Sequence, residues 1–477
     1  MATKRVRANF LTKKDGIQNT TAVDRISKLP DHLIHRILSF VPTIDVVRMS
    51  ILSRHWRRVW YSVPSLHLCH TDHMDRFHFH SQPEQAFYKF VNKCLKHRER
   101  SARYITDSSI SSLKLHIEYY RDNPALDNLS TFAIWRNIEE LDLCTEPRYL
   151  YYRNCYCLPE VVLNARSLTV LKLGHLIIEG SCSISLPSVT FLSLAYVKLR
   201  DKTLYNLLLG CSAIEKFVLT RCYELSDPKI SSLRLKFLEI EDDKAFETLE
   251  IEAINLESFK YDGNCEDINL SACKAIRSLS LLDIMLDDES MEDLICGFPL
   301  LESLTLYHSL NVEHIRICGQ HLKNIRLDKY YEPAQKYLEI TIEAPNLVSF
   351  HYKGNIKRAI SIKGLDTILN GHIVIKGPYP GQEDYYDRDW YINLIRFLLK
   401  INFYWNTTVS LHVYSEEALI FPENLRKFFH SLWSNLKHLK VMTFCDLKKI
   451  PELRDALYWI SPSLETLVIK KKTKGYY

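Results

Sequence analysis

The strongest structural signal in this chain of 477 residues stands in Ser167-Leu168-Thr169-Val170-Leu171-Lys172-Leu173-Gly174. Its leucines follow the order apolar-x-x-apolar-x-apolar. In an extended strand Leu171 and Leu173 would point to one face and Lys172 to the other. The same order returns along the chain, and from Leu171 to Phe350 its middle positions stand about 20 to 25 residues apart. One such unit cannot bury its apolar face alone, so the period predicts strands stacked in parallel around a shared core.

This period lies in the range of leucine-rich repeats, and we therefore expect an α/β fold: a curved parallel sheet with helices on its outer side. Residues 204–209 and 291–296 carry apolar side chains at helical spacing and should form such helices. Between Tyr352 and Leu436 the period fades, residues 377–381 predict a loop, and the apolar spacing from Trp390 to Ile401 predicts another helix. The order returns at Leu436 and Leu464.

The N-terminal part has a different pattern, typical of three short helices. Pro30 suits a first helical turn, and apolar residues follow at three- and four-residue spacing until Pro42. Thr43 and Asp45 are N-cap types for a second helix, and Ser53 for a third. So small a bundle has too little core to be stable alone and should dock on a larger unit. An amphipathic helix from near residue 83 is expected to cap one end of the repeats.

The helical segment resembles an F-box. The resemblance rests on Leu29-Pro30-Asp31-His32-Leu33-Ile34-His35-Arg36-Ile37-Leu38-Ser39 and on the later Asp45-Val46-Val47-Arg48, Leu52-Ser53-Arg54, Trp56-Arg57 and Trp60. In that family the module binds the Skp-type adaptor of a cullin-based ubiquitin ligase. The resemblance implies an adaptor contact at Leu29, Pro30, Ile34, Ile37, Leu38, Val46, Val47, Leu52, Trp56 and Trp60. The alternative, an internal core, stays open above all for Trp56 and Ile37.

The repeats and the C-terminal end extend the resemblance to plant F-box proteins with leucine-rich repeats. It rests on segments such as Phe298-Pro299-Leu300-Leu301-Glu302-Ser303-Leu304, and the last stretch resembles the FBD region of such proteins. The expected organisation is a basic N-terminal tail at 1–21, an F-box at 22–68, a linker and capping helix at 69–105, a solenoid at 106–405 and an FBD-like region at 406–477.

Charge and composition bound the partners. With 62 Lys and Arg against 57 Asp and Glu the formal charge is +5, and the basic excess lies in the first hundred residues. That is too little to indicate nucleic acid as a partner. No apolar run approaches the roughly 20 residues that span a membrane, and none resembles a secretory signal, so we expect no membrane association and a nuclear or cytoplasmic location. The 13 Cys are expected as free thiols.

A search for catalytic and metal motifs finds no glycine-rich phosphate loop, GxSxG or HExxH. Residues of ligand type for zinc gather at His70, Asp72, His73, Asp75, His78 and His80, but a polar loop at a domain joint explains them as well. Cys155 and Cys157 would share one strand face, where packing explains them. We expect no enzyme activity, no cofactor and no metal.

The function that follows is substrate recognition for a Skp–cullin–F-box ubiquitin ligase, with the solenoid holding an unidentified target protein. The concave strand face would contact the target, at Lys172, Glu239, Lys260, Thr305, Arg326 and His351. Two alternatives stay open: a scaffold that degrades nothing, and a small-molecule receptor of the F-box/LRR type. The receptor would need a basic or aromatic pocket, and the concave residues do not form one in the sequence.

Overall fold

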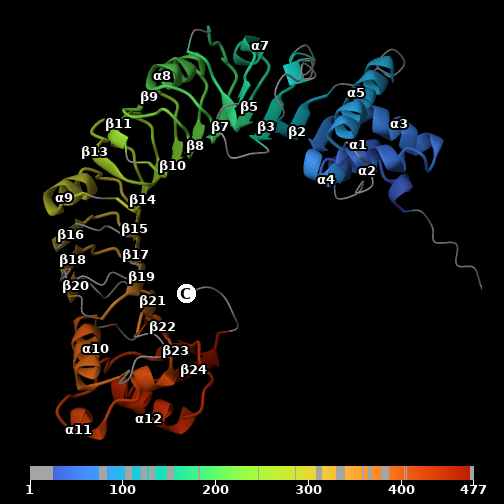
Figure 1. The fold of residues 1–477 in the computed structure, drawn as a ribbon. Coiled ribbons are helices and arrows are strands. Elements are labelled where there is room, and N and C mark those ends of the chain that lie inside the picture. The colour runs from blue at the N-terminus through green and yellow to red at the C-terminus, as the bar shows by residue number, and fades with distance from the viewer. Residues whose placement is uncertain are drawn as a thin grey trace, which may run out of the picture.

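The computed structural model curves as one long arc (Figure 1). It describes residues 25–74, 83–101, 110–119, 126–127, 131, 134, 136–147, 155–180, 183–244, 246–284, 286–307, 314–328, 339–356, 359–363, 368–377, 386–401, 403 and 406–472. The expected basic tail at 1–21 lies outside these residues, as does most of the expected loop at 377–381.

The inner side of the arc is one parallel sheet of sixteen strands. In spatial order the strands are β1 (Ser65–Cys69), β2 (Ser112–Tyr119), β3 (Glu140–Pro147), β5 (Val170–Gly174), β7 (Phe191–Ala195), β8 (Lys216–Thr220), β10 (Phe237–Glu241), β12 (Ser258–Asp262), β14 (Ser278–Leu282), β15 (Ser303–Tyr307), β17 (Asn324–Asp328), β19 (Ser349–Gly354), β21 (Asn370–Ile375), β22 (Thr408–Val413), β23 (His438–Thr443) and β24 (Thr466–Lys471). Each strand lies beside the next in sequence within this sheet, as stacked repeats require.

The register of the sheet follows the apolar pattern. Leu171 pairs with Leu141 on one side and Leu192 on the other, and all three are buried. Lys172, between the two leucines of its strand, pairs with Ser193 and is only half-buried. The predicted alternation of core-facing and concave-facing residues, and with it the α/β solenoid, is confirmed.

The outer side of the arc is more varied than predicted. Helices α8 (Asp201–Gly210), α9 (Asp288–Cys296) and α10 (Arg388–Lys400) form where the spacing indicated them (Figure 1). Other repeats return through short strands, grouped as β9 (Lys229–Ser231), β11 (Phe246–Glu252) and β13 (Cys265–Asn269), as β16 (His314–Cys318), β18 (Glu339–Glu343) and β20 (Ala359–Lys363), and as β4 (Tyr156–Cys157) with β6 (Leu176–Ile177). In β11 the run Leu249-Glu250-Ile251-Glu252 alternates with a period of two, which favours a strand.

The sheet also continues where the sequence pattern fades. Strands β21 and β22 fill the interval between Tyr352 and Leu436 and pair with β19 and β23. The apolar-x-x-apolar-x-apolar order is hard to recognise in this interval because Gly371 takes the place of the usual large apolar residue. Phe403 fills the space beside Gly371. The helices α11 (Glu423–Arg426) and α12 (Ile450–Ile460) cover this end of the arc.

At the other end lies a helical module of α1 (Asp31–Leu38), α2 (Thr43–Met49) and α3 (Arg54–Ser62), preceded by a 3-10 turn, η1 (Ile26–Lys28). Ser53 caps α3 as predicted, accepting the backbone N–H of Trp56 at 3.1 Å. The predicted capping of α2 by Thr43 or Asp45 is wrong, because Pro42 is its N-cap and Thr43 lies in its first turn. The Thr43 hydroxyl instead accepts the backbone N–H of His67 at 2.7 Å, which ties α2 to β1.

In the described residues, the module is joined to the solenoid through strand β1. Strand β1 follows α3 directly in the sequence and pairs with β2. The first strand of the sheet is therefore continuous with the last helix of the module. The predicted amphipathic helix is α5 (Pro83–Ser101), which packs Phe87, Val91 and Cys94 into the core. Its Arg98 donates to the carbonyl oxygens of Trp60 and Val63, each at 2.7 Å. Among the residues described, no helix combines the length and apolarity that crossing a bilayer requires.

Candidate functional site

Half of the residues predicted for the adaptor contact lie inside the helical module. Ile34, Leu38, Val46, Trp56 and Trp60 are all buried in its core. The indole N–H of Trp56 also donates to the Ser27 hydroxyl at 2.9 Å. This burial favours the alternative of an internal core for these side chains, and their contact with an adaptor stays a prediction.

The remaining predicted residues lie nearer the surface. Pro30 is exposed, Ile37 is 45% exposed and Leu52 is 71% exposed, whereas Leu29 and Val47 are half-buried against the core. Their contact with an adaptor stays a prediction.

The sequence reasoning missed the most exposed apolar side chains of the module. Phe40 is 82% exposed and Ile51 80% exposed, and Leu33 lies on the same face of α1 as Ile37. Leu33, Ile37 and Phe40 stand at i, i+4 and i+7, the spacing of one helix face, so a second apolar face of α1 could have been recognised. These residues border a hollow of about 560 Å³ lined by Leu29, Leu33, Arg36, Ile37, Phe40 and Val41.

We call Leu33, Ile37, Phe40, Ile51 and Leu52 the apolar face of the module. Full burial of such a side chain contributes about 1.5–3 kcal/mol, so leaving several of them in water is costly for an isolated chain. Leu33, Ile37 and Phe40 gather around one hollow, and an exposed apolar patch of that kind is typical of surfaces that bind another protein.

The concave residues predicted to contact a target do share one surface. In the register of the sheet, Lys172 pairs with Ser193, Glu239 with Lys260, and Arg326 with both Thr305 and His351. They therefore form one row across neighbouring strands, but the row is long. Lys172 on β5 and His351 on β19 are separated by seven strands of the sheet, so no compact partner could contact all of them at one point.

A histidine cluster lies at the C-terminal part of this row: His351 and His372 belong to the row, and His412 stands two residues along β22 from Ser410, which pairs with His372. The rings of His351 and His372 stack with centroids 4.6 Å apart, and the ring of His412 lies 4.4 Å from that of His372. The carboxylate of Asp328 forms ion pairs with two of these neighbours: it lies 2.9 Å from Nε2 of His351 and 2.7 Å from Nη2 of Arg326. Lys440 and Lys472 add positive charge to the same cluster.

Comparison with known proteins shows which family the chain is related to. The F-box domain model matches residues 26–68, and the model described as At1g61320/AtMIF1, LRR domain, matches residues 106–277. F-box/LRR-repeat protein 25 of Arabidopsis thaliana is 32% identical over 225 residues, which are 47% of this chain and 78% of that relative. The chain belongs to the F-box/LRR-repeat family. The resemblance found in its sequence is thereby confirmed.

Other relatives of this F-box/LRR-repeat protein share less of their length with it. F-box protein At5g03100 of Arabidopsis thaliana is 31% identical over 46% of this chain and 64% of its own length. FBD-associated F-box protein At4g13985 of the same plant is 29% identical over 50% of this chain and 52% of its own length. The chain thus covers less than two thirds of these two proteins, one of which carries the FBD in its name.

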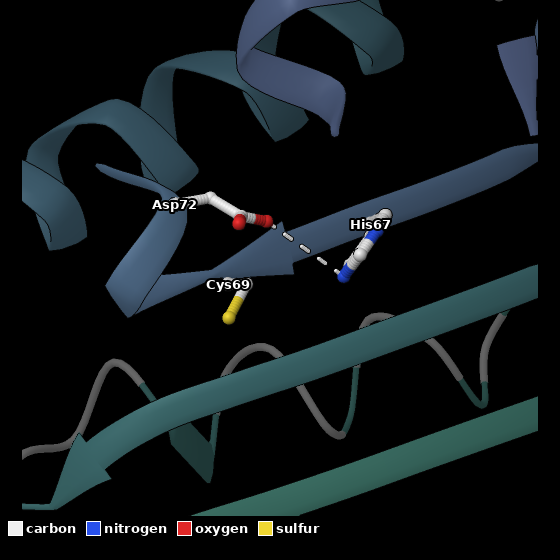
Figure 2. A group of neighbouring side chains, drawn as sticks. All are labelled: His67, Cys69 and Asp72. Carbon is white, nitrogen blue, oxygen red and sulfur yellow. Dashed lines mark ion pairs between the residues drawn. The ribbon is translucent and has the colours of Figure 1, made fainter. Parts of the chain in front are cut away.

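A second cluster of titratable side chains lies where the F-box meets the solenoid. His67 and Cys69 stand on β1, and Asp72 on the short helix α4 (His70–Met74) that follows it (Figure 2). Of the residues that the sequence grouped as zinc-type ligands, Asp72 belongs to this cluster, whereas His70 turns to Glu118 at 3.6 Å. Asp75, His78, His80 and the side chain of His73 lie outside the described residues.

Cys155 and Cys157, the other pair singled out from the sequence, flank the buried Tyr156.

The histidine cluster makes stability depend on pH in a defined direction. Burial, and after it the neighbouring His351, Arg326 and Lys472, lowers the pKa of His372 to about 4. Burial and then His372, Lys472 and Lys440 lower the pKa of His412 to about 4. Because an unfolded histidine has a pKa near 6.5, acid protonates the unfolded chain first. The contribution of both histidines to stability is complete above about pH 6.5 and is lost as pH falls toward 4.

We therefore expect urea midpoints for the solenoid to fall between pH 7.5 and pH 5, and to fall less in a His372→Gln/His412→Gln variant. His438 offers a matched control, since its ring binds the hydroxyl of Thr466 at 2.7 Å outside the cluster. A His438→Gln variant should keep the wild-type pH profile. An unchanged profile in the double variant would show that other groups cause the acid sensitivity.

Proposed function

We propose that this F-box/LRR-repeat protein is the substrate-recognition subunit of a Skp–cullin–F-box ubiquitin ligase. In this role the F-box binds a Skp-type adaptor, and through it the cullin, while the solenoid binds a target protein. The observation that carries the proposal is the apolar face of the module, which is exposed in the chain alone. A receptor of this kind supplies no catalytic group itself and acts by raising the local concentration of the target. Its location would be the nucleus or the cytoplasm.

The proposed adaptor contact differs from the one expected from the sequence. Leu33 and Ile37 would enter the interface from α1, Phe40 from the turn that follows it, and Ile51 and Leu52 from the turn after α2. Leu29 and Pro30 would border it, since Leu29 lines the adjacent hollow. The five buried residues would support this surface from beneath rather than contact the adaptor: Ile34, Leu38, Val46, Trp56 and Trp60.

The direct test is binding of a purified Skp-type adaptor to the full-length protein. We expect Ile37→Asp/Phe40→Asp to weaken binding roughly tenfold or more, because it places two charges in an apolar interface. Leu233→Asp is the matched control, since Leu233 is an exposed apolar residue like Ile37 and Phe40 but lies in the solenoid. This variant should bind the adaptor as the wild type does. Circular dichroism checks that each variant is folded. Equal binding by the double variant, or no binding by the wild type, would contradict the proposed adaptor contact.

The proposed target surface is the concave row, including Lys172, Glu239, Lys260, Thr305, Arg326 and His351. A ligase reconstituted with this protein distinguishes a receptor from a scaffold, because a target held by a receptor becomes ubiquitinated. A partner that is captured but stays unmodified would favour the non-degradative scaffold.

The histidine cluster supports a second candidate, a receptor for a small anionic molecule. Arg326, Lys440 and Lys472 lie around three histidine rings on the concave side, which is the basic and aromatic setting that the sequence alone did not reveal. A thermal-shift screen with phosphorylated and carboxylated metabolites tests it. A shift that Lys440→Glu abolishes would favour this candidate, and no shift with any of them would exclude it for the compounds screened.

A further inference from the structure

We propose that His67, Cys69 and Asp72 bind a zinc ion at the joint between the F-box and the solenoid. The inference is independent of the adaptor contact, because none of the three residues belongs to the apolar face of the module.

The backbone brings the three side chains together. His67 and Cys69 are two residues apart on β1 and therefore point to the same side of the strand. The chain turns at once into α4, which carries Asp72 back over the end of that strand (Figure 2). One ligand atom of each residue then lies within 4.8 Å of those of the other two.

The separation of His67 and Asp72 leaves room for a metal ion between them. Nε2 of His67 and Oδ2 of Asp72 are 3.9 Å apart, which is too long for a hydrogen bond. In a tetrahedral zinc site, with bonds of about 2.0–2.3 Å, neighbouring ligand atoms stand about 3.3–3.8 Å apart. The three atoms would have to approach one another by about 1 Å, which side-chain rotation can supply.

The donor set points to zinc among the divalent ions. Imidazole nitrogen, thiolate sulfur and carboxylate oxygen are the three ligand types of protein zinc sites, whereas Mg²⁺ and Ca²⁺ prefer oxygen alone. Three protein ligands leave a fourth position for water. His116 lies opposite Cys69 on β2, and its ring is held by Asp142 at 2.9 Å.

The position of the thiol supports the site. Cys69 is half-buried on β1. Its Sγ lies 2.9 Å from the hydroxyl oxygen of Thr71, which holds the sulfur near the start of α4.

The backbone around the site is already fixed. The N–H of His67 donates to the Thr43 hydroxyl, and β1 pairs with β2 along its length. A bound ion would add a link from β1 to α4 at the edge of the sixteen-stranded sheet. It would therefore stabilise the junction through which the F-box is held in place.

The test is zinc binding by the full-length protein after treatment with a chelator. We expect one zinc ion per chain by elemental analysis after dialysis, and roughly tenfold weaker binding or more for Cys69→Ser and Asp72→Asn. Cys157→Ser is the matched control, because Cys157 is an exposed cysteine on β4, and it should bind zinc as the wild type does. Cobalt in place of zinc should give a thiolate-to-metal absorption band that Cys69→Ser abolishes.

The stability readout separates a site from a structural defect. Added zinc should raise the melting temperature of the wild type and of Cys157→Ser but not that of Asp72→Asn. Melting curves without metal show whether each variant is folded. The proposal is overturned if the wild type retains no more zinc than His67→Ala/Cys69→Ser, or if cobalt binds without the thiolate band.

Discussion

Replacing Arg98 with methionine should reduce the free energy of unfolding by about 3 kcal/mol and loosen the F-box from the solenoid. Arg98 is 2% exposed, and its two terminal nitrogens donate to the carbonyl oxygens of Trp60 and Val63. Both carbonyls belong to the C-terminal end of α3, where no further turn of helix satisfies them. Methionine fills a similar volume without donating, so two buried acceptors would lose their partner, at about 1–3 kcal/mol each.

The positive charge of Arg98 stabilises the contact in addition to the two hydrogen bonds. Burial, and after it Arg136, lowers the pKa of Arg98 to about 10, so the side chain is still a cation at neutral pH. It faces the negative end of the α3 dipole and lies 5.7 Å from the ring centre of Trp60. A neutral replacement loses these attractions as well.

Urea unfolding and hydrogen exchange measure the effect of Arg98→Met. Amides of residues 54–69 should exchange faster, whereas those of β10 to β15 should not change, because repeats interact mainly with their neighbours. Arg100→Met is the matched control, since Arg100 lies on the same helix and is exposed. A loss equal in the two variants, or faster exchange throughout the solenoid, would contradict the role assigned to Arg98.

The parts of the fold that the sequence predicted correctly depend on local periodicity. Leu171 and Leu173 show the strand period, and the segment that became α8 shows the helical one, so their elements and buried faces follow from spacing alone. The joint between F-box and solenoid could not be predicted in this way. It depends on Thr43 and Arg98, whose partners lie 24 and at least 35 residues away in sequence.

The candidate sites show the same division. The concave row was predictable, because Glu239 and Lys260 hold the same place in neighbouring repeats. Only Ile37 and Leu52 of the apolar face of the module were named from the sequence. Helix α1 is apolar on two sides, and the sequence does not say which side the module buries: Ile34 is buried and Ile37 is exposed. The histidine cluster joins His351, His372 and His412 from three strands, one of which lies where the repeat pattern fades.

Restoring the repeat pattern at Gly371 with leucine should destabilise the protein by about 3 kcal/mol. The position pairs with Phe350 and Val409, where the other repeats carry a large apolar residue, so consensus reasoning would expect a gain. A Cβ atom at Gly371 would lie 2.8 Å from Cζ and 2.9 Å from Cε1 of Phe403. The ring of Phe403 cannot yield easily, because it is 1% exposed and packs edge-on against Trp433 at 5.4 Å.

Trp433 makes this packing rigid, since its indole N–H donates to the carbonyl oxygens of Leu398 and Ile401 at 3.0 and 2.7 Å. If Phe403 is the obstacle, Phe403→Ala should open space for the new leucine, and the two changes together should cost at least about 1 kcal/mol less than their sum. Gly377→Ala is the control, because a Cβ there meets Trp390 at an ordinary 3.5 Å, and it should change stability little. Additive losses in urea unfolding, or a gain for Gly371→Leu alone, would mean that this repeat tolerates the consensus residue and that Phe403 does not replace it.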